Sequence, residues 1–451
     1  MTITTRIRYR AGLLAAGSLL VVGSLAGCTA ITPTTDASST AVSAVDLQTT
    51  GDFWDSGTVH TISVELSDDA LDEALSTYLD SGEKVWVSGT VTIDGETFEN
   101  IGLKLKGNSS LRGASVDSDP VTLPWIIRLD EFVDGQNLDG ETEFVVRGNS
   151  SESSLNEAVA LDLLDASGLA AEQAVATRFS VNGSDATLRL VVQNPGEEWV
   201  DQVFGTDGLL YKADSRGDYS YRGDDAAAYT DVFTQKAGDD DLTPLIDFLQ
   251  FINESDDETF AAELGEHLDV ESFATYLAFQ DLVDNFDDIS GPGNNSYLYY
   301  DPATGLMEVV NWDLNLAFGS SPGDGGGQEG AGQGGAGQGG AAPGSAAQGG
   351  ARDGQGGMPV GDDTRGAGAA PGGAAGGMDS SNVLAERFLA DPGFSALYDA
   401  AVAELQSSLV DSGQASAIID AWVAVLGDQA SDLIGVSTLE SEAAGIRAYV
   451  E

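Results

Sequence analysis

The alternation of apolar and polar residues predicts that the first half of the chain is rich in β-strands. The segment "HTISVELS" (60–67) alternates strictly, and residues 84–107 read as two strands around Asp94-Gly95, a common hairpin turn. We expect strands throughout the region from Val59 to about Leu105. Further strands are expected at 122–132, 142–150, 174–183, 187–193 and 208–214. Residues 174–183 and 187–193 pair across Asn182-Gly183 as a second hairpin.

One helix is expected in this half, at about 153–167. Its apolar residues Leu155, Val159 and Leu163 follow helical spacing, and Gly168 is a typical stop signal. The first half is therefore predicted to be a strand-rich lobe with one helix packed on it.

The second half has helical periodicity. Helices are expected at 241–253, 256–268 and 269–286, and again within 381–435. Between them, "SYLYY", the turn "DPATG" and "LMEVVNWD" read as a hairpin that ends near residue 313. Strands followed by helices predict an α+β fold.

Composition divides the chain further. Residues 320–380 consist largely of Gly, Ala and Gln, a composition that cannot pack a core. We interpret this stretch as a disordered insertion within one domain, with the core at 56–319 and the C-terminal helices of the same domain at 381–451. Residues 28–55, rich in Thr, Ser, Ala and Asp, are expected to be a flexible tether.

The N-terminus has the features of a secretory signal. Three arginines within residues 6–10 precede an apolar run at 11–25, which ends in "LAGC" at Cys28. This ending resembles the lipobox of bacterial lipoproteins. The resemblance implies that residues 1–27 are a signal peptide and that the thiol of Cys28 carries a lipid. The protein is then expected outside the cytoplasm, anchored in the bacterial cell membrane.

Charge excludes one class of partner. The chain has 73 acidic and 19 basic residues, a net charge of −54. Nucleic-acid binding needs a basic surface, so we expect no nucleic-acid partner. Because the acidic residues are scattered through every segment, we expect them to form a solvated surface.

Few residues suit nucleophilic or zinc chemistry. The two histidines, His60 in an expected edge strand and His267 on an expected helix, are predicted to be ordinary surface residues. The cysteine and histidine spacing of a zinc site is absent. Carboxylates and asparagines remain, and these are ligands for Mg²⁺ or Ca²⁺.

The densest candidate site lies between residues 284 and 319. A hairpin brings its two ends side by side, so Asp313 is expected near Asn294 and Asn295, with Asp287 in the same loop. Protein kinases arrange a base, an Asn and a metal-binding Asp around a hairpin in this order. Each residue alone is equally suited to a capping or turn role.

Several motifs in order carry a family resemblance. They are "LKLKGNSSLRG" (103–113), "IIRLDEF" (126–132), "EFVVRGNSSESSLNEAVALDLLDASGL" (143–169), "GLLYKAD" (208–214), "NFDDISGPGNNSYLYYDPATG" (285–305), "NWDLNLAFG" (311–319) and "LAERFLADPGFSALY" (384–398). Together they resemble the CotH family, the spore-coat-protein-H-type atypical protein kinases. The resemblance spans roughly residues 58–430.

The resemblance implies a two-lobed atypical kinase fold, with a strand-rich N-lobe and a helical C-lobe. It implies ATP as co-substrate and Mg²⁺ or Mn²⁺ as cofactor. Asp287 would orient or deprotonate the acceptor hydroxyl, Asp313 would hold the metal, and Asn294 or Asn295 would be the second metal ligand.

A basic residue should also meet the phosphates. Arg128 stands where the family often has Lys, and Lys104 and Lys106 are alternatives. Two other positions depart from the family pattern, Gln193 and Asn315, where acidic residues are common. The two "GNSS" copies, at 107–110 and 148–151, are either Ser-capped turns or backbone turns that approach phosphate.

Three functional hypotheses follow. The first is a kinase that phosphorylates Ser/Thr of a protein substrate, or another hydroxyl, at the cell surface. The second is a catalytically weak pseudokinase that serves as a surface binding or adhesion lipoprotein, which the departures from the family pattern favour. The third is a calcium-binding surface module, suggested by acidity alone.

Overall fold

The fold is taken from a computed structural model that describes residues 53–107, 109–205, 208–214, 217–291, 295–320 and 382–450. All described residues belong to one compact unit. Cys28, Asn294, the predicted signal peptide and nearly all of the predicted insertion lie outside the described residues.

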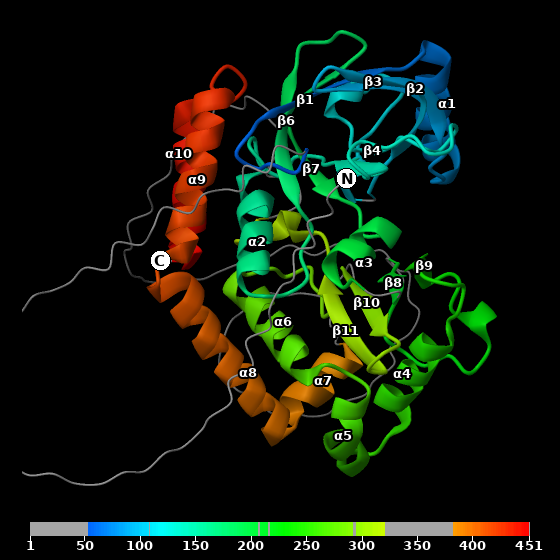
Figure 1. Ribbon diagram of the computed structural model, residues 1–451, viewed down its shortest axis with the longest axis vertical. Coiled ribbons are helices and arrows are strands. Elements are labelled where there is room, and N and C mark those ends of the chain that lie inside the picture. Colours follow the sequence, from blue (N-terminus) through cyan, green and yellow to red (C-terminus); the bar gives the residue numbers. More distant parts are fainter. Residues whose placement is uncertain are drawn as a thin grey trace, which may run out of the picture. The chain divides into compact units, whose positions relative to one another are not determined.

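Seven strands form a closed barrel in the order β1-β2-β3-β4-β5-β7-β6 (Figure 1). They are β1 (His60–Glu65), β2 (Val87–Ile93), β3 (Glu96–Leu105), β4 (Trp125–Arg128), β5 (Glu143–Val146), β6 (Ala174–Val181) and β7 (Thr187–Gln193). Neighbouring strands are antiparallel except β1 and β6, whose parallel pairing closes the barrel. This closure leaves no free sheet edge.

Alternation along each strand divides the barrel into two faces. Inward positions such as Leu103, Leu105 and Phe144 are fully buried in one apolar cluster. Lys104, between Leu103 and Leu105 on β3, and Lys106, directly after the strand, belong to the opposite face. The barrel therefore carries these lysines on its outer face.

A second sheet has four strands in the order β11-β10-β8-β9. They are β8 (Leu209–Ala213), β9 (Phe233–Ala237), β10 (Ser296–Asp301) and β11 (Leu306–Asn311). The hairpin of β10 and β11 is confirmed, with Ser296 opposite Asn311. Residues 208–214 were expected in the strand-rich first lobe, which is wrong: β8 pairs with β10, nearly 90 residues later, because its apolar side chains complete this sheet.

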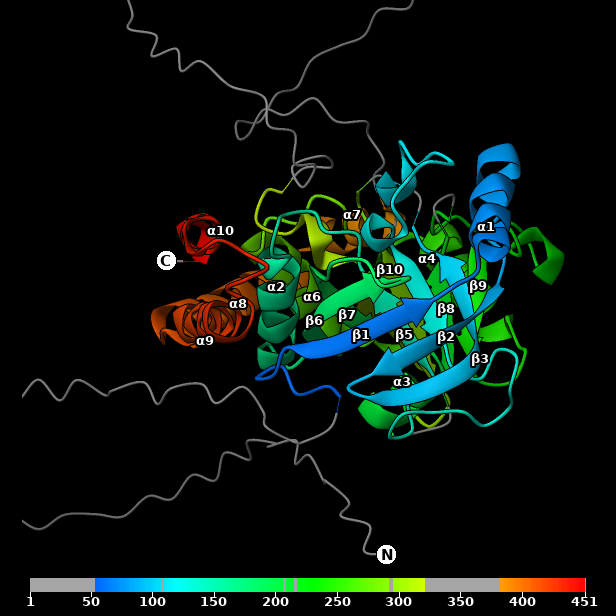
Figure 2. The same ribbon diagram turned by 90° about the horizontal axis from the view of Figure 1, so that it is seen from above.

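Ten α-helices lie among the described residues. They are α1 (Asp68–Ser81), α2 (Leu155–Ala166), α3 (Glu197–Val203), α4 (Thr243–Glu254), α5 (Asp257–Glu263), α6 (Val270–Leu282), α7 (Val383–Ala390), α8 (Pro392–Leu405), α9 (Gln414–Gln429) and α10 (Val436–Val450). Figures 1 and 2 show α9 and α10 beside α2, and their apolar residues share one cluster with those of α2, β6 and β7.

Helix α8 continues in a π-helical turn before α9. Within the part of the chain that the structure describes, no single helix has the length and hydropathy of a membrane span. The pair Pro392–Asp411 and Gln414–Gln429, bent by 48°, meets these criteria only when taken together.

The two-residue turn motifs in the sequence predicted the hairpins correctly. Asp94 and Gly95 both have positive φ, as do Asn182 and Gly183, so both hairpins are confirmed. The expectation of strands throughout 59–105 was wrong, because α1 occupies residues 68–81. The Ser67 side chain accepts a hydrogen bond from the first turn of α1, and Gly82 ends the helix with φ 78°.

Mixed α and β structure is confirmed, whereas the closed barrel was not foreseen. The expected single helix of the first half is present as α2, but α1 and α3 were missed there, as was β9 later in the chain.

The prediction that His60 is a surface residue on an edge strand is wrong. Its side chain is 6% exposed, and its Nδ1 lies 2.6 Å from Oδ2 of Asp94. Its Nε2 lies 3.2 Å from the carbonyl oxygen of Asp55. Barrel closure buries β1, so His60 instead fastens the β2–β3 turn and the segment before β1 to the barrel.

This contact makes stability depend on pH. Burial lowers the pKa of His60, but the hydrogen bond and charge of Asp94 and the Asp55 carbonyl outweigh it, so the pKa lies above its ordinary value. The contribution is then present in full below the unfolded-state pKa of about 6.5 and is lost as pH rises through the folded-state pKa.

We expect His60→Gln to lower the urea midpoint more at about pH 5.5 than at about pH 9. In an Asp94→Asn background this difference between the two pH values should shrink, since the partner that raises the pKa is gone. An equal loss at both pH values in the wild-type background would contradict this account.

Candidate functional site

Asp313 stands where β11 leaves the second sheet. The strand ends at Asn311, Trp312 is buried, and Asp313 takes a left-handed conformation with φ 65° before a short 3₁₀ turn at Leu314–Leu316. Asp tolerates this conformation better than most residues. The turn directs its carboxylate to the barrel, where Oδ1 accepts a hydrogen bond from Arg147 and Oδ2 lies 3.8 Å from Nζ of Lys106.

Arg147 is the centre of this site. It follows β5 directly and is 3% exposed. Its Nε donates to Oε2 of Glu157 at 2.8 Å, and its Nη2 lies 2.5 Å from Oε1 of the same carboxylate. Glu157 is in the first turn of α2. Arg147 therefore joins the barrel, α2 and the end of β11 through one buried guanidinium.

Three cations surround the indole ring of Trp312. Nζ of Lys106 lies 5.1 Å from the ring centroid, Cζ of Arg147 5.8 Å and Nζ of Lys212 5.0 Å. These distances are within the range of cation–π attraction. Lys212 belongs to β8, so the second sheet contributes one cation and the barrel side two.

The surroundings of Lys106 and Lys212 lower the pKa of both side chains. Burial, with the charge of Arg147 second, lowers the pKa of Lys106 well below its ordinary value. Burial, Lys106 and Lys236 lower the pKa of Lys212 to about 7. An anion bound among them would favour their charged forms. The arrangement is suited to binding an anionic group.

Glu172 does not neutralise this cluster. It is 3% exposed, and neither carboxylate oxygen has a hydrogen-bond partner among the described residues. Burial raises its pKa to about 8, although Arg147 and Lys106 act in the opposite direction. At neutral pH its protonated, uncharged form predominates, so Glu172 adds no negative charge beside these basic side chains.

The loop after α6 is fastened to the hairpin at two points. Asn295 Nδ2 donates to Oδ2 of Asp287 at 2.9 Å, so the expected proximity of these two residues is found. On the other side, Asn285 Nδ2 donates to Gln280 at 2.8 Å, and Gln280 Nε2 donates to Asn311 at 2.7 Å. Asn295 and Asp313 flank the paired residues Ser296 and Asn311, at the same end of the hairpin.

Of the three basic residues that the sequence analysis proposed for phosphate binding, only Lys106 lies beside Asp313. Lys106 reaches Asp313 as described, whereas Lys104 Nζ lies 3.9 Å above the ring of Trp86. Arg128 pairs with Asp130 at 2.9 Å and lies 3.7 Å from Glu131. It is opposite Gly102 in the sheet, away from the end of β3 that leads to Lys106. The arginine beside Asp313 is therefore Arg147 and not Arg128, the residue that the sequence analysis proposed.

The oxygen donors suit a hard divalent cation. Asp313 offers carboxylate oxygens, and Asn295 uses only its amide nitrogen in the bond to Asp287. Among the described residues, no group of three or more His, Cys, Asp or Glu side chains gathers into a metal site. A metal on Asp313 would share its carboxylate with Arg147 and Lys106.

A family model described as "CotH kinase protein" matches residues 104–437. The chain belongs to the CotH family. It is also 25% identical to the inner spore coat protein H of Bacillus subtilis (strain 168) over 195 residues. That alignment covers 42% of this chain and 53% of the relative, so it spans about half of the relative's length.

Sequence reasoning about this CotH-family chain missed the residues that organise the site. Arg147, Glu157 and Lys212 were not named as candidates, although all three lie in motifs that carry the family resemblance. A signal was present: Lys212 is a lone cation in the apolar strand "LLYKA", and Arg147 precedes a helix with Glu157 in its first turn.

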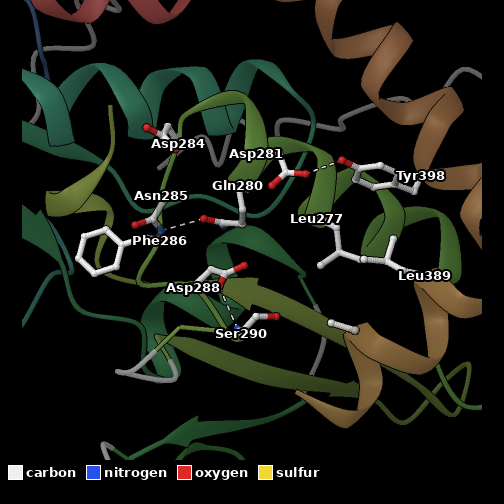
Figure 3. A pocket seen from close by; sticks show the side chains of 11 residues that line it. Leu277, Gln280, Asp281, Asp284, Asn285, Phe286, Asp288, Ser290, Leu389 and Tyr398 are labelled. Carbon is white, nitrogen blue, oxygen red and sulfur yellow. Dashed lines mark hydrogen bonds between the residues drawn. The ribbon is translucent and has the colours of Figure 1, made fainter. Parts of the chain in front are cut away.

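A separate cavity of about 320 Å³ lies behind the loop after α6 (Figure 3). Three carboxylates line it, those of Asp281, Asp284 and Asp288, together with the hydroxyl of Tyr398, which donates to Asp281. Burial raises the pKa of Asp288 to about 6. This lining is acidic, which disfavours an anionic ligand in this cavity.

The ion pair of Arg147 and Glu157 predicts a stability effect. Glu157→Ala should reduce the free energy of unfolding by about 3 kcal/mol, because it removes one of two carboxylates from a buried guanidinium. Glu152→Ala, an exposed neighbour with the same charge change, should cost less than about 0.5 kcal/mol. Urea unfolding of both variants measures the difference, and equal midpoints would disprove the role given to this pair.

Proposed function

We propose that this CotH-family protein is an atypical kinase that transfers the γ-phosphate of ATP to Ser/Thr of a protein substrate, or to another hydroxyl. The observation that carries the proposal is the cluster of Lys106, Arg147 and Lys212 around Trp312, next to the carboxylate of Asp313. A polyphosphate is an anion that such a cluster suits. Membership of a family described as "CotH kinase protein" supports it.

In this proposal the barrel with α2 is the N-lobe of a two-lobed kinase fold. The four-stranded sheet and its helices form the C-lobe. The phosphates lie between Lys106 and Arg147 on one side and Lys212 on the other. Asp313 and Asn295, with Asn294 as an alternative, hold Mg²⁺ or Mn²⁺, which supplies positive charge for the phosphates when bound.

Asp287 acts on the acceptor. Its carboxylate, held by Asn295, orients the hydroxyl and takes its proton as the acceptor oxygen bonds to the γ-phosphorus. The bond between that phosphorus and the bridging oxygen breaks, and ADP carries away the electron pair. Lys106 and Lys212 stabilise the negative charge of the transferring group.

A catalytically weak pseudokinase that serves as a surface binding or adhesion protein is the second candidate. The contacts of Asp313 favour it, because a metal has to compete with Arg147 and Lys106 for this carboxylate. Arg128, the cation that the family resemblance implied for phosphate, is engaged by Asp130.

The test is transfer of label from γ-labelled ATP by the full chain, with Mg²⁺ or Mn²⁺. We expect Asp313→Asn, Asp287→Asn and Lys212→Met each to reduce transfer at least about 100-fold. The exposed Asp134→Asn should leave it unchanged.

Thermal stabilisation by ATP with Mg²⁺ is recorded in the same samples. Stabilisation without transfer to the protein or a generic acceptor would replace the kinase by the pseudokinase. If both transfer and stabilisation are absent, the kinase proposal is overturned and a surface-binding protein that does not use ATP is left. Stabilisation by Ca²⁺ alone would then support a calcium-binding module.

We also propose that the protein is a lipoprotein at the outer face of the bacterial cell membrane, anchored through Cys28 with residues 29–55 as tether. The support is the signal-like N-terminus ending in "LAGC". Protein substrates at the cell surface would be its partners, and its acidity disfavours nucleic acid.

Lipidation is tested by metabolic labelling with a fatty acid in a bacterial host. The wild-type chain should carry label and sediment with membranes, whereas Cys28→Ser should lose the label and leave the membrane fraction. Equal labelling of the two proteins would rule out Cys28 as the attachment site. Ser24→Ala, also upstream of the tether, serves as a control that should keep the label.

A further inference from the structure

The C-terminal helix α10 contacts both halves of the candidate site. It covers residues 436–450 and so lies almost wholly beyond the residues that the family model matches. Figures 1 and 2 show it near α2, and it packs in the same apolar cluster. Two of its polar side chains, Glu442 and Tyr449, reach segments that carry Arg147's partners.

Glu442 caps the start of α2 from outside. Its carboxylate accepts hydrogen bonds from the backbone N–H groups of Glu152 at 2.8 Å and Ser153 at 3.2 Å. It also accepts from the hydroxyl of Ser151 at 3.1 Å and from that of Ser153. One carboxylate thus receives four hydrogen bonds from the second "GNSS" copy and the residues after it.

The same serines satisfy the first N–H groups of the helix. Ser154 N–H donates to Oγ of Ser151 at 3.0 Å, and Leu155 N–H donates to Oγ of Ser153 at 3.1 Å. Ser154 itself, in the cap position with φ 55°, makes no side-chain cap bond. The negative charge of Glu442 is therefore relayed through two hydroxyls to the positive end of α2.

The first turn of α2 leads directly to the site. Glu157 holds Arg147, as described above. One residue earlier, Asn156 Nδ2 donates to the backbone oxygen of Asn315 at 2.6 Å. A displacement of this turn would move both the guanidinium beside Asp313 and the backbone that follows it.

The far end of α10 contacts the segment after Asp313. The ring of Tyr449 lies 6.1 Å from that of Phe318, centroid to centroid. Gly319 has φ 63°, and a Cβ built on it would fall 2.1 Å from the Tyr449 hydroxyl oxygen. The tyrosine is thus packed directly over Gly319.

We propose that Glu442 is a positioning residue for the candidate site, acting through the start of α2 on Arg147 and on the turn that carries Asp313. The ligand effect of this inference rests on the proposed function, since it concerns phosphate binding. Helix α10 acts as a strap: Glu442 fixes the arginine side and Tyr449 fixes the aspartate side.

The experiment compares Glu442→Gln with Glu440→Gln in the full chain. Both changes remove one negative charge from α10 at constant size, and Glu440 is exposed. Amide hydrogen exchange by mass spectrometry reports segments 150–158 and 313–320, and titration with ATP and Mg²⁺ reports affinity. We expect Glu442→Gln to speed exchange in both segments and to weaken binding about fivefold, the factor that loss of one helix cap corresponds to.

Exchange in β3 should stay at its wild-type rate, since the buried apolar residues of β3 and those of α10 belong to different clusters. Tyr449→Ala removes the contact of α10 with the segment after Asp313, and it should also speed exchange in both segments. It replaces Glu442→Gln if that variant does not fold.

Faster exchange confined to 150–158 would mean a local cap only and would overturn the positioning role. Equal exchange in the Glu442 and Glu440 variants would overturn the inference entirely. If the wild-type chain binds no ATP, the proposed function fails, whereas the exchange comparison still decides whether α10 couples the two segments. Unchanged affinity together with faster exchange would show that the strap does not serve ligand binding.

Discussion

The guanidinium of Arg147 is the constraint on which the arrangement of the site depends. A buried charge costs free energy unless it is paired, and here two carboxylates from distant segments pair with one arginine. Glu157 brings α2 to the end of β5, and Asp313 brings the end of β11 to the same point. These ion pairs thereby connect the barrel to the second sheet. They fix which residues meet there, which apolar packing alone would not do.

This positive centre lies in a chain with a net charge of −54. Under the proposed function, this contrast would attract an anionic ligand to the place where Lys106, Arg147 and Lys212 meet. Glu172, uncharged at neutral pH, leaves that attraction intact. The acidic cavity behind the loop after α6 strengthens the contrast from the other side. Overall composition therefore gave no sign of this local cluster of basic side chains.

The parts of the site that could be predicted were those written in contiguous motifs. Asp287, Asn295 and Asp313 stand around one hairpin, whose pairing follows from alternation and a short turn. Arg147 could not be assigned in this way, because its partners lie 10 and 166 residues further along the chain. Arg128 matched the position of the family's lysine in its motif, yet in the structure its side chain pairs with Asp130.

Local conformational preference is what the sequence by itself determined. Asp94-Gly95 and Asn182-Gly183 accept positive φ, so their hairpins and registers follow without help from the rest of the chain. Barrel closure by the parallel pairing of β1 with β6, and the packing of α10 on the start of α2, were decided only in the tertiary structure. Both depend on burying apolar surface and pairing charges between segments far apart in sequence, and no local pattern encodes which distant partner satisfies those requirements.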